Sequence, residues 1–587
     1  MKTNLMKIQR PLLAFEFADS NGKIIPLTFQ HPIKVIRADK IDEVLSYFQI
    51  IQDAVDNGYF AAGFLSYESA AAFDSAYRIK EGSTMPLLWF GIFSEPLQQP
   101  ISGTGTYTLT EWKPSVEMDD YNQSILSIKQ SIESGDTYQT NYTIRLNSHF
   151  QGDDIAFFEK LKSAQASNYC AYINTDEHSI LSASPELFFH LKGDKITTRP
   201  MKGTIKRGKS AEEDEANASW LYQSEKNRAE NLMIVDLLRN DLGMIAEPGT
   251  VSVPKLFEIE QYPTVHQMTS TITAKVSSNT KVVDIFKALF PCGSITGAPK
   301  ISTMNIISEL EQEPREVYCG AIGFITPDKE AIFNVPIRTV MIEHKSGQAT
   351  YGVGGGITWD STTEGEYQEI LAKASLLKEN RPEFQLLESL LLNQSNYFLL
   401  EEHLNRLKNS AQYFGFRCNL ADVNNTLDEF SKQNHNGELK VRLLIAKNGN
   451  ITIEGNSLKH PEAALKVLLA NKPIEKDNLF LYHKTTNREI YSQFQVQKPA
   501  DIFDVLLWNE DGELTEFING NVVLEIDGSL WTPSLKSGLL AGTFREMLLK
   551  NGEIREKTLT IADLQKSTKI WFINSVRKWL EVQLINL

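Results

Sequence analysis

The chain has 587 residues, of which 42% are hydrophobic and 23% charged, and its formal net charge is −15. This composition is globular, the length is too great for one ordinary core, and the acidic balance argues against a nucleic-acid partner. No apolar run approaches the ~18–20 residues that would span a bilayer, so we expect no membrane association.

The N-terminal segment and the cysteines bear on location. The first 17 residues hold only a short apolar stretch, which Glu16 interrupts, so they do not predict a signal peptide. The four cysteines form no CxxC pair, which argues against a disulfide framework or a zinc site and favours a reducing compartment. We therefore expect a cytoplasmic protein.

A β-hairpin is predicted over residues 182–205, where two strand-like runs flank a polar turn at residues 192–195. A turn centred near residue 193 or 194 would pair Glu186 with residue 201 or 202, which would bring a carboxyl group beside Lys202. A one-residue slip would put the two side chains on opposite faces, and an ordinary cross-strand ion pair is the alternative.

Lys202 is the most informative residue of this hairpin, because it follows Pro-Met and precedes Gly-Thr. The adjacent glycine lets another group approach closely. A partly desolvated lysine loses its charge more easily than a lysine in water and becomes a usable nucleophile. The alternative is a solvated lysine before a turn.

Two long amphipathic helices are predicted, over residues 216–242 and 362–378. The second carries Glu366 and Glu369, which are three residues apart and so share one face, and the first carries Glu230. Glutamates that converge from two helices suit a hard cation such as Mg²⁺, which takes one or two carboxylates and keeps several waters. The alternative is that these glutamates belong to solvated helix faces.

Two small-residue loops accompany these helices. Residues 293–300 open a helix with a proline at its start, so their free N–H groups and Thr296 could hold an anion. Gly354–Gly356 form a second loop, at which the backbone can approach a ligand. Glycine loops alone are weak signals, so their meaning depends on the motifs around them.

A domain boundary is expected at residues 378–384, where a polar run that includes Pro382 follows the second helix. It divides the chain into domains at 1–378 and 379–587. The first domain mixes short alternating segments with a few long helices, which favours an α+β fold over a doubly wound α/β fold.

The second domain contains a lysine, a glutamate, an arginine and a helix-opening loop. Lys484 is surrounded by aromatic residues and threonines, Glu516 follows it, and Arg406 lies on a predicted helix. The loop at residues 538–545 runs into a helix and could cradle a phosphate. A pyridoxal 5'-phosphate site requires these groups, to bind the cofactor, keep its ring nitrogen protonated and hold its phosphate. Taken alone, Lys484 would be a surface lysine.

In chain order, the N-terminal motifs resemble the chorismate-utilising enzymes, which include anthranilate synthase component I, aminodeoxychorismate synthase component I, and isochorismate and salicylate synthases. The resemblance implies antiparallel sheets packed as a sandwich with outer helices. A lysine in the Pro-x-Lys-Gly-Thr segment resembles the aminodeoxychorismate synthase branch, since the anthranilate branch has alanine there. The resemblance covers roughly residues 50–378 and is carried by Ser182–Glu186, Pro200–Thr204, Arg228–Asn231, Val235–Asp241, Gly293–Lys300, Ile337–Thr339 and Glu366–Glu369.

The same resemblance implies a mechanism. Lys202 attacks chorismate at C2, Glu186 protonates the departing C4 hydroxyl, ammonia enters at C4 and Lys202 leaves, which gives 4-amino-4-deoxychorismate. The implied Mg²⁺ ligands are Glu230 and Glu369, with Glu366 in support. The implied substrate contacts are Thr204, Thr296, Tyr318, Arg338, Gly355, Gly356 and Lys373.

The chain departs from the family pattern at three positions. Gln267 stands where a histidine is expected, with His266 one place earlier. Asn227 stands where an acidic residue is expected three positions before Glu230. Gln139 stands where isochorismate-forming relatives have a water-activating lysine, which argues against that branch.

Residues 384–587 resemble the fold-type IV pyridoxal phosphate enzymes, which have an α/β domain. Among them are branched-chain and D-amino-acid aminotransferases and aminodeoxychorismate lyase. Relatives often carry threonine at position 544, where this chain has phenylalanine, and Asn574–Arg577 resembles a substrate-carboxylate segment. The implied cofactor site consists of the catalytic Lys484, Glu516 on the ring nitrogen, and Arg406 with the amides of Thr543 and Phe544 on the phosphate.

The two halves together predict a bifunctional synthesis of 4-aminobenzoate, a folate precursor, in which the second half releases pyruvate. One alternative is an anthranilate synthase-like half fused to an aminotransferase. Another is a second half that only dimerises or senses the cofactor. No cysteine has a nucleophile-elbow context, so we expect a separate glutamine amidotransferase subunit to supply ammonia. A homodimer through the second domain is also expected, because fold-type IV relatives dimerise.

Overall fold

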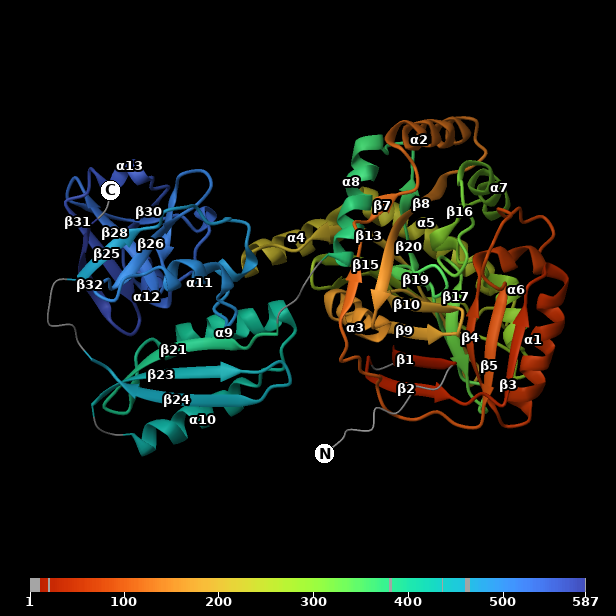
Figure 1. Ribbon diagram of the computed structural model, residues 1–587, viewed down its shortest axis with the longest axis horizontal. Helices are drawn as coiled ribbons and strands as arrows, with labels where there is room; N and C mark the ends of the chain where they lie inside the picture. Colours follow the sequence, from red (N-terminus) through yellow and green to blue (C-terminus); the bar gives the residue numbers. More distant parts are fainter. Residues whose placement is uncertain (1–10, 20–21, 379–382, 435–436, 460–464, 586–587) are drawn as a thin grey trace. The chain divides into compact units, whose positions relative to one another are not determined.

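The computed structural model describes residues 11–19, 22–378, 383–434, 437–459 and 465–585 (Figure 1). They form two compact units. The first contains the described residues up to 207 and those from 217 to 378, and the second contains residues 208–216 and the described residues from 383 onward. The first ten residues, and residues 379–382 of the linker expected at 378–384, lie outside the described residues. No helix in the described ranges is long and apolar enough to cross a membrane.

Two ten-stranded antiparallel sheets form the frame of the first unit. One has the order β16 (Gly297–Ala298), β8 (Gln139–Gly152), β20 (Gln348–Ile357), β19 (Thr339–Glu343), β10 (His178–Ser184), β9 (Tyr169–Asn174), β1 (Leu12–Ala18), β2 (Ile24–Gln30), with β6 (Tyr107–Leu109) and β7 (Lys113–Pro114) on β8. The other has the order β13 (Met201–Lys206), β15 (Val265–Lys275), β12 (Lys195–Arg199), β11 (Leu187–Lys192), β18 (Ala331–Asn334), β17 (Ala321–Ile325), β4 (Phe60–Leu65), β5 (Leu88–Phe93), β3 (Lys34–Ala38), with β14 (Ser252–Gln261) on β15.

Side chains of the first sheet alternate between two apolar layers. On β1, Leu13 and Phe15 join a core that also contains residues of the second sheet, whereas Leu12 and Ala14 join a layer with residues of α2 (Met118–Glu133), α3 (Asp154–Gln165) and α8 (Thr363–Ala374). This period of two is that of a strand buried on both faces. On the second sheet, α1 (Ile41–Asp56) packs against β3, β4, β5 and α6 (Val282–Leu289). The expected sandwich with outer helices is confirmed.

The two long helices differ from their predicted extents. The helix expected over residues 216–242 is two helices, α4 (Ala211–Gln223) and α5 (Glu225–Gly243). Ser224 divides them because its hydroxyl accepts the Asn227 amide and caps the second helix. The other helix ends as α8 at Ala374 and continues as the 3₁₀ turn η3 (Ser375–Leu377). The loop at residues 293–300 forms η2 (Gly293–Ile295) and β16 and leads into α7 (Lys300–Leu310).

The hairpin has its turn at the predicted place, with Gly193 at a φ of 62°. Its register differs from the prediction. The β11–β12 ladder shifts by a residue and ends at Leu187 opposite Arg199, so the expected ladder pairing of Glu186 with residue 201 or 202 was wrong. Pro200 follows, and because proline has no N–H the chain leaves the ladder there and continues as β13, which pairs with β15.

The second unit has two sheets. A four-stranded sheet has the order β22 (Asn396–Tyr397), β21 (Leu386–Asn393), β23 (Glu438–Ile445), β24 (Ile451–Ser457) and packs with α9 (Leu400–Phe414) and α10 (Leu420–Gln433). An eight-stranded sheet has the order β27 (Leu514–Phe517), β26 (Asp504–Trp508), β25 (Leu465–Leu469), β32 (Lys578–Leu584), β31 (Lys569–Asn574), β28 (Gly520–Ile526), β29 (Ser529–Pro533), β30 (Arg555–Lys557).

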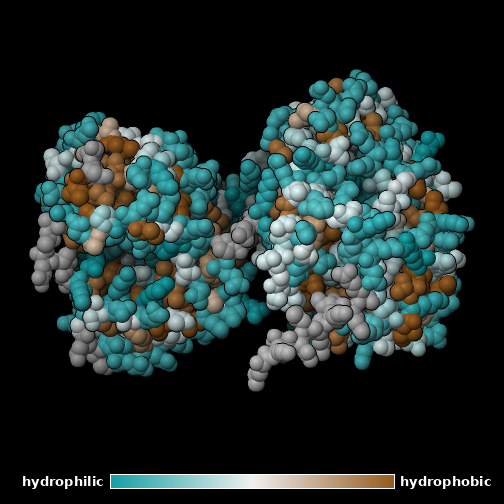
Figure 2. Space-filling view, viewed as in Figure 1, coloured by the Kyte–Doolittle hydropathy of each residue, from teal (hydrophilic) through white to brown (hydrophobic). Residues whose placement is uncertain are grey.

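An additional β27–β28 pairing closes six strands of the larger sheet into a ring. The ring encloses an apolar core that includes Leu506, Phe517 and Val522. Three short helices accompany it: α11 (Glu489–Val496), α12 (Thr543–Lys550) and α13 (Ile561–Leu564). Figure 2 shows that hydrophilic residues cover most of the visible face of each unit.

Candidate active sites

The first site brings Glu186 and Lys202 together. Glu186 follows β10, is 3% exposed, and accepts hydrogen bonds from the Ser294 hydroxyl (2.5 Å) and the Met201 amide. Burial raises the pKa of Glu186 to about 7, against the opposing effects of Ser294 and of the Lys202 charge. Burial also lowers the pKa of Lys202, and the charge of Lys373 lowers it further. The site therefore holds an acid that is partly protonated at neutral pH beside a lysine whose pKa is lower than that of a lysine in water.

The backbone around Lys202 is held by two amide side chains. Asn231 on α5 donates to the Lys202 carbonyl (3.3 Å). Gln267 on β15 donates to the Gly203 carbonyl (2.8 Å) and accepts from the Thr204 hydroxyl (2.8 Å). Gln267 thus holds the backbone just after Lys202 in place. It also hydrogen-bonds the Thr204 hydroxyl, which was expected to bind substrate.

The departures at positions 267 and 227 have different local consequences. His266 is next to Gln267 on a strand, so the alternation of side chains puts it on the opposite face and it does not take the place of the expected histidine. Asn227 donates to the Ser224 hydroxyl (2.8 Å) within the first turn of α5. The Asn227 side chain therefore hydrogen-bonds the N-cap residue of α5.

Gly355 and Gly356 on β20 let the strand approach the reacting groups. A Cβ on Gly356 would lie 1.7 Å from Gln139 Nε2 and 3.0 Å from Lys202 Nζ, so the space at this position is already filled. A Cβ on Gly355 would meet the carboxylates of Glu366 and Glu369 on α8, at 3.0 and 3.4 Å. The glycines therefore bring the lysine and the carboxylates against one strand, as their small size predicted.

Three carboxylates lie in this region. Glu366 and Glu369 share one face of α8, and Glu369 interacts electrostatically with Glu230 on α5. Burial raises the pKa values of Glu230 and Glu366. Burial also acts to raise the pKa of Glu369, but the ion pair with Lys373 (2.5 Å) and the charges of Lys202 and Arg338 together outweigh burial and lower it.

No group of three or more His, Cys, Asp or Glu side chains in the described part of the chain has metal-site spacing. Glu366 and Glu369 nevertheless converge over Gly355, and Glu230 is close to Glu369. Two or three carboxylates of this kind fit a cation that keeps several of its waters, as Mg²⁺ does.

Two cations expected to hold substrate carboxylates are neighbours. Lys373 Nζ donates to the Gly354 carbonyl (2.7 Å). Arg338 has a φ of 53° and donates to the Lys373 carbonyl (3.4 Å). Lys373 also lowers the pKa of Lys202, so its charge acts on the residue that was predicted to be the nucleophile.

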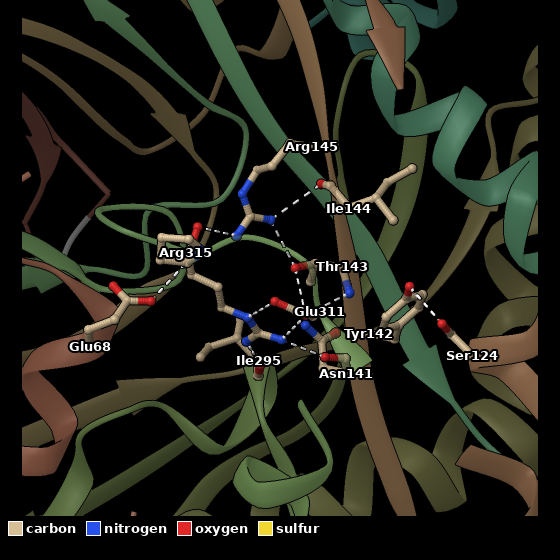
Figure 3. A network of polar contacts seen from close by, with 11 residues as sticks. Glu68, Ser124, Asn141, Tyr142, Thr143, Ile144, Arg145, Ile295, Glu311 and Arg315 are labelled. Carbon is tan, nitrogen blue, oxygen red and sulfur yellow. Dashed lines mark hydrogen bonds and ion pairs between the residues drawn. The ribbon is translucent and has the colours of Figure 1, made fainter. Parts of the chain in front are cut away.

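A buried polar network surrounds Arg315 and Glu311 (Figure 3). Arg315 pairs with Glu311 (2.6 Å), with 1% and 3% of the side chains exposed, and donates to carbonyls in the 293–300 loop and in β8 (both 2.7 Å). Arg145 lies over the Tyr318 ring, 5.2 Å from its centroid. The Thr296 hydroxyl donates to the Cys292 carbonyl (3.1 Å), so this hydroxyl already has a partner within the protein.

The second site is a cavity of about 470 Å³ in the second unit. Lys484 lines it, and burial lowers the lysine pKa to about 7, with the charge of Arg406 adding to the effect. Glu516 also lines the cavity, is 4% exposed, and accepts from the Tyr491 hydroxyl (2.8 Å) and the Leu540 amide (3.2 Å). Burial raises the pKa of Glu516 to about 7.

Arg406 lies on α9 and forms a bidentate pair with Glu388 (2.9 and 2.6 Å). Burial acts to raise the pKa of Glu388, but Arg406 and His403 outweigh it and lower the pKa to about 2. Arg406 also donates to the Ala541 carbonyl (3.1 Å), two residues before α12 begins at Thr543. Among the described residues no side chain caps α12, so its first amides are suited to an anion.

Phe544 and the segment Asn574–Arg577 were also singled out in the sequence, and the structure places them differently with respect to the cavity. The Phe544 side chain is 4% exposed and packs with Phe398 and Trp579 (ring centroids 6.0 and 6.2 Å), so it offers no counterpart to the threonine hydroxyl of relatives. Asn574–Arg577 all line the cavity, where a substrate-binding segment was expected.

The residues that hydrogen-bond Glu186, Glu516 and Arg406 were not predicted from the sequence. Ser294 on Glu186 lies inside the glycine loop that was singled out for anion binding, so its hydroxyl was not considered separately. Tyr491 on Glu516 lies on α11 and carried no motif. Glu388 is the one charge in the apolar run Leu386–Leu392, and that isolation was the available signal.

The family model of the chorismate binding enzymes matches residues 97–379. Aminodeoxychorismate synthase component 1 of Klebsiella aerogenes is 41% identical over 271 residues, which are 46% of this chain and 60% of that protein. Anthranilate synthase component 1 of Methanothermobacter marburgensis is 33% identical over 340 residues, covering 54% of this chain and 73% of that protein. The chain belongs to the chorismate-binding enzymes. It spans about three fifths of the length of its Klebsiella relative.

A solved structure supports the fold of this chorismate-binding enzyme. Anthranilate synthase component I from Streptococcus pneumoniae has a TM-score of 0.52 at 24% identity, covering 63% of this chain and 91% of that one. The model of the class IV amino-transferases matches residues 385–585. The second unit of this chorismate-binding enzyme therefore has the fold of the class IV, pyridoxal phosphate-dependent proteins.

Proposed function

We propose that the chain is a bifunctional enzyme that makes 4-aminobenzoate from chorismate and ammonia. The first unit forms 4-amino-4-deoxychorismate, and the second eliminates pyruvate from it. The observation that carries the proposal is the pairing of Lys202 with the buried acid Glu186 in a chorismate-binding unit, on the same chain as a second lysine–glutamate site. The Klebsiella relative named aminodeoxychorismate synthase component 1 supports the first step.

In the first unit, the proposed nucleophile is Lys202. Its neutral amine attacks C2 of chorismate, the two ring double bonds shift, and the C4 hydroxyl leaves as water with a proton from Glu186. Ammonia then attacks C4, the double bonds shift back, and Lys202 leaves from C2 as an amine. The pKa of Glu186, raised to about 7, keeps part of the acid protonated for the first step.

The remaining groups of the first unit organise the substrate. Lys373 and Arg338 bind its carboxylates, and Gly355 and Gly356 admit the ring close to β20. The carboxylates Glu230, Glu366 and Glu369 hold Mg²⁺, which neutralises substrate charge when bound. Thr204, Thr296 and Tyr318 complete the proposed site, the last two as positioned neighbours.

In the second unit, the donor set fits pyridoxal phosphate, which supplies an electron sink for the elimination. Lys484 binds the cofactor and, with a pKa of about 7, gives and takes a substrate proton. Glu516 holds a proton at the ring nitrogen. Arg406 and the amides of Thr543 and Phe544 bind the phosphate.

The proposal includes partners and location. Ammonia comes from a separate glutamine amidotransferase subunit, and the name component 1 of the relatives supports a second component. Two copies pair through the second unit. The four cysteines are free, which fits the reducing cytoplasm.

Product analysis tests the proposal. Purified full-length protein, loaded with pyridoxal phosphate and given chorismate, an ammonium salt and Mg²⁺, is expected to release 4-aminobenzoate and pyruvate in equal amounts. Anthranilate as the product would overturn it in favour of the anthranilate synthase-like alternative. Lys202→Ala is expected to stop the consumption of chorismate, and full synthesis by this variant would remove the covalent role of the lysine.

A further inference from the structure

A buried histidine joins two sides of the cavity of the second unit. His403 lies on α9, is 1% exposed and does not itself line the cavity. Its Nδ1 contacts the Glu388 carboxylate on β21 (2.6 Å), and its Nε2 contacts the hydroxyls of Ser575 (3.0 Å) and Thr543 (3.3 Å). Thr543 is the first residue of α12, Ser575 lies in the turn between β31 and β32, and both line the cavity.

The Glu388 carboxylate fixes which ring nitrogen of His403 carries the proton. Arg406 and His403 lower the pKa of Glu388 to about 2, so the carboxylate is ionised at neutral pH and can only accept hydrogen bonds. Burial lowers the pKa of His403 despite the opposing charge of Glu388, so the ring is neutral. The single ring proton is therefore on Nδ1, where it is donated to Glu388, and Nε2 is left as an acceptor.

Two hydroxyls compete for this one acceptor, because the Nε2 atom of a neutral histidine has a single lone pair. Ser575 is the nearer of the two, and its other acceptor is the Ser389 carbonyl at 3.4 Å. Among the described residues, His403 is the acceptor recorded for the Thr543 hydroxyl. A Thr543 hydroxyl that donates to a phosphate oxygen cannot also donate to His403, so it leaves Nε2 entirely to Ser575.

The same carboxylate also holds the arginine proposed to bind the cofactor phosphate. Glu388 accepts both arms of Arg406, which in turn donates to the Ala541 carbonyl in the loop before α12. Arg406 is thus tied to His403 through Glu388, and the start of α12 is tied to it through Thr543. The phosphate end of the cavity and the β31–β32 turn therefore share one buried carboxylate–histidine pair.

We propose that His403 is a positioning residue that couples phosphate binding at the start of α12 to the β31–β32 turn, by passing its Nε2 acceptor from Thr543 to Ser575. The inference rests on the proposed cofactor of the second unit and deepens it. Coupling of this kind is reciprocal, so the Ser575 hydroxyl in turn strengthens phosphate binding by competing with Thr543 for His403.

The test measures cofactor affinity on the full-length protein, with no substrate present. Dissociation constants of pyridoxal 5'-phosphate and of pyridoxal, which lacks the phosphate, are obtained from the absorbance of the bound cofactor. Their ratio is the phosphate preference of the site. Ser575→Ala leaves the Thr543 hydroxyl held by His403 and is expected to lower this preference about threefold to tenfold, the effect of one hydrogen bond.

The same substitution is then made in two backgrounds that interrupt the path. Thr543→Val removes the hydroxyl and keeps the backbone amide, and His403→Asn keeps a donor toward Glu388 without an acceptor that reaches the hydroxyls. In neither background is Ser575→Ala expected to change the phosphate preference. The control is Ser431→Ala, a buried hydroxyl on α10 that donates to the Asp428 carbonyl, which should behave as the wild type.

An unchanged phosphate preference in Ser575→Ala would overturn the proposal. A loss that persists in either background would also overturn it, because Ser575 would then act on the phosphate without His403 and Thr543. The Thr543→Val background keeps the test decisive if His403→Asn does not fold. If the coupling is found but no pyruvate is released from 4-amino-4-deoxychorismate, the lyase function falls while the role of His403 stands. A wild type that binds no cofactor would overturn both.

Discussion

The two lysine sites use the same local arrangement in unrelated folds. Each places a lysine of lowered pKa near a buried glutamate whose pKa burial raises to about 7. Each glutamate is held by one side-chain hydroxyl and one backbone amide, from Ser294 and Met201 in the first unit and from Tyr491 and Leu540 in the second.

The surroundings of the two pairs have opposite charge. Glu230, Glu366 and Glu369 lie around Lys202, which suits a cation between protein and substrate. Cations outnumber acids around Lys484, which suits anions bound directly. Burial therefore shifts the pKa values of the lysine and the glutamate in both sites. The charges around each pair differ, so the first site favours a bound cation and the second favours anions.

The largest expected effect separates the two lysines. Lys484→Ala is expected to reduce pyruvate release on the order of a thousandfold or more, because no other amine replaces it, while chorismate consumption is unchanged. The measurement is pyruvate formation beside chorismate loss, with the exposed Lys472→Ala as control. The variant should accumulate 4-amino-4-deoxychorismate. Equal loss of both reactions would show that the sites are not independent.

The acid of the first site gives the next effect. Glu186→Gln is expected to reduce chorismate turnover by about 10²–10⁴-fold, because the C4 hydroxyl then leaves without a proton donor. Pyruvate release from added 4-amino-4-deoxychorismate should keep the wild-type rate. The surface carboxylate Glu177, replaced by glutamine, serves as control. A Glu186→Gln enzyme with full turnover would exclude an acid role for this residue.

The buried network of the first unit has no counterpart among the residues that hold Glu516. Glu311→Ala leaves the Arg315 guanidinium buried without its carboxylate, and is expected to lower the free energy of unfolding of the first unit by about 3–5 kcal/mol. Thermal unfolding followed by tryptophan fluorescence measures this, and the pyridoxal phosphate absorbance of the second unit should not change. The exposed Glu313→Ala is the matched control. An equally small change in both variants would mean that the pair contributes no net stability.

The sequence predicted the fold class, the hairpin turn and the shared face of Glu366 and Glu369, because periodicity and turn residues are local signals. It predicted that Lys202 lies near Glu186 but not the strand register, which depends on the shift between Leu187 and His190 and on Pro200. It did not predict that Lys440 and Arg442 line the cavity of the second unit. Lys440 and Arg442 alternate with apolar residues on β23, which in a sequence is the pattern of an ordinary solvated strand face.

The smallest expected effect tests whether the hydroxyl on each acid tunes it. The Ser294 hydroxyl stabilises the charged form of Glu186 and so lowers its pKa against burial. Removing it in Ser294→Ala raises the Glu186 pKa, so the acid stays protonated to higher pH. The fall in chorismate turnover that accompanies deprotonation of Glu186 should therefore move upward by about one pH unit.

The matched variant is Tyr491→Phe, which removes the hydroxyl from Glu516 and should leave the pH profile of chorismate turnover in place. The measurement is kcat/KM for chorismate across pH 6–9 at saturating ammonium and Mg²⁺. An unmoved profile in Ser294→Ala would mean that another group limits the alkaline side. A profile moved by both variants would mean that the two acids are coupled through the chain, and the separation between the sites would then have to be abandoned.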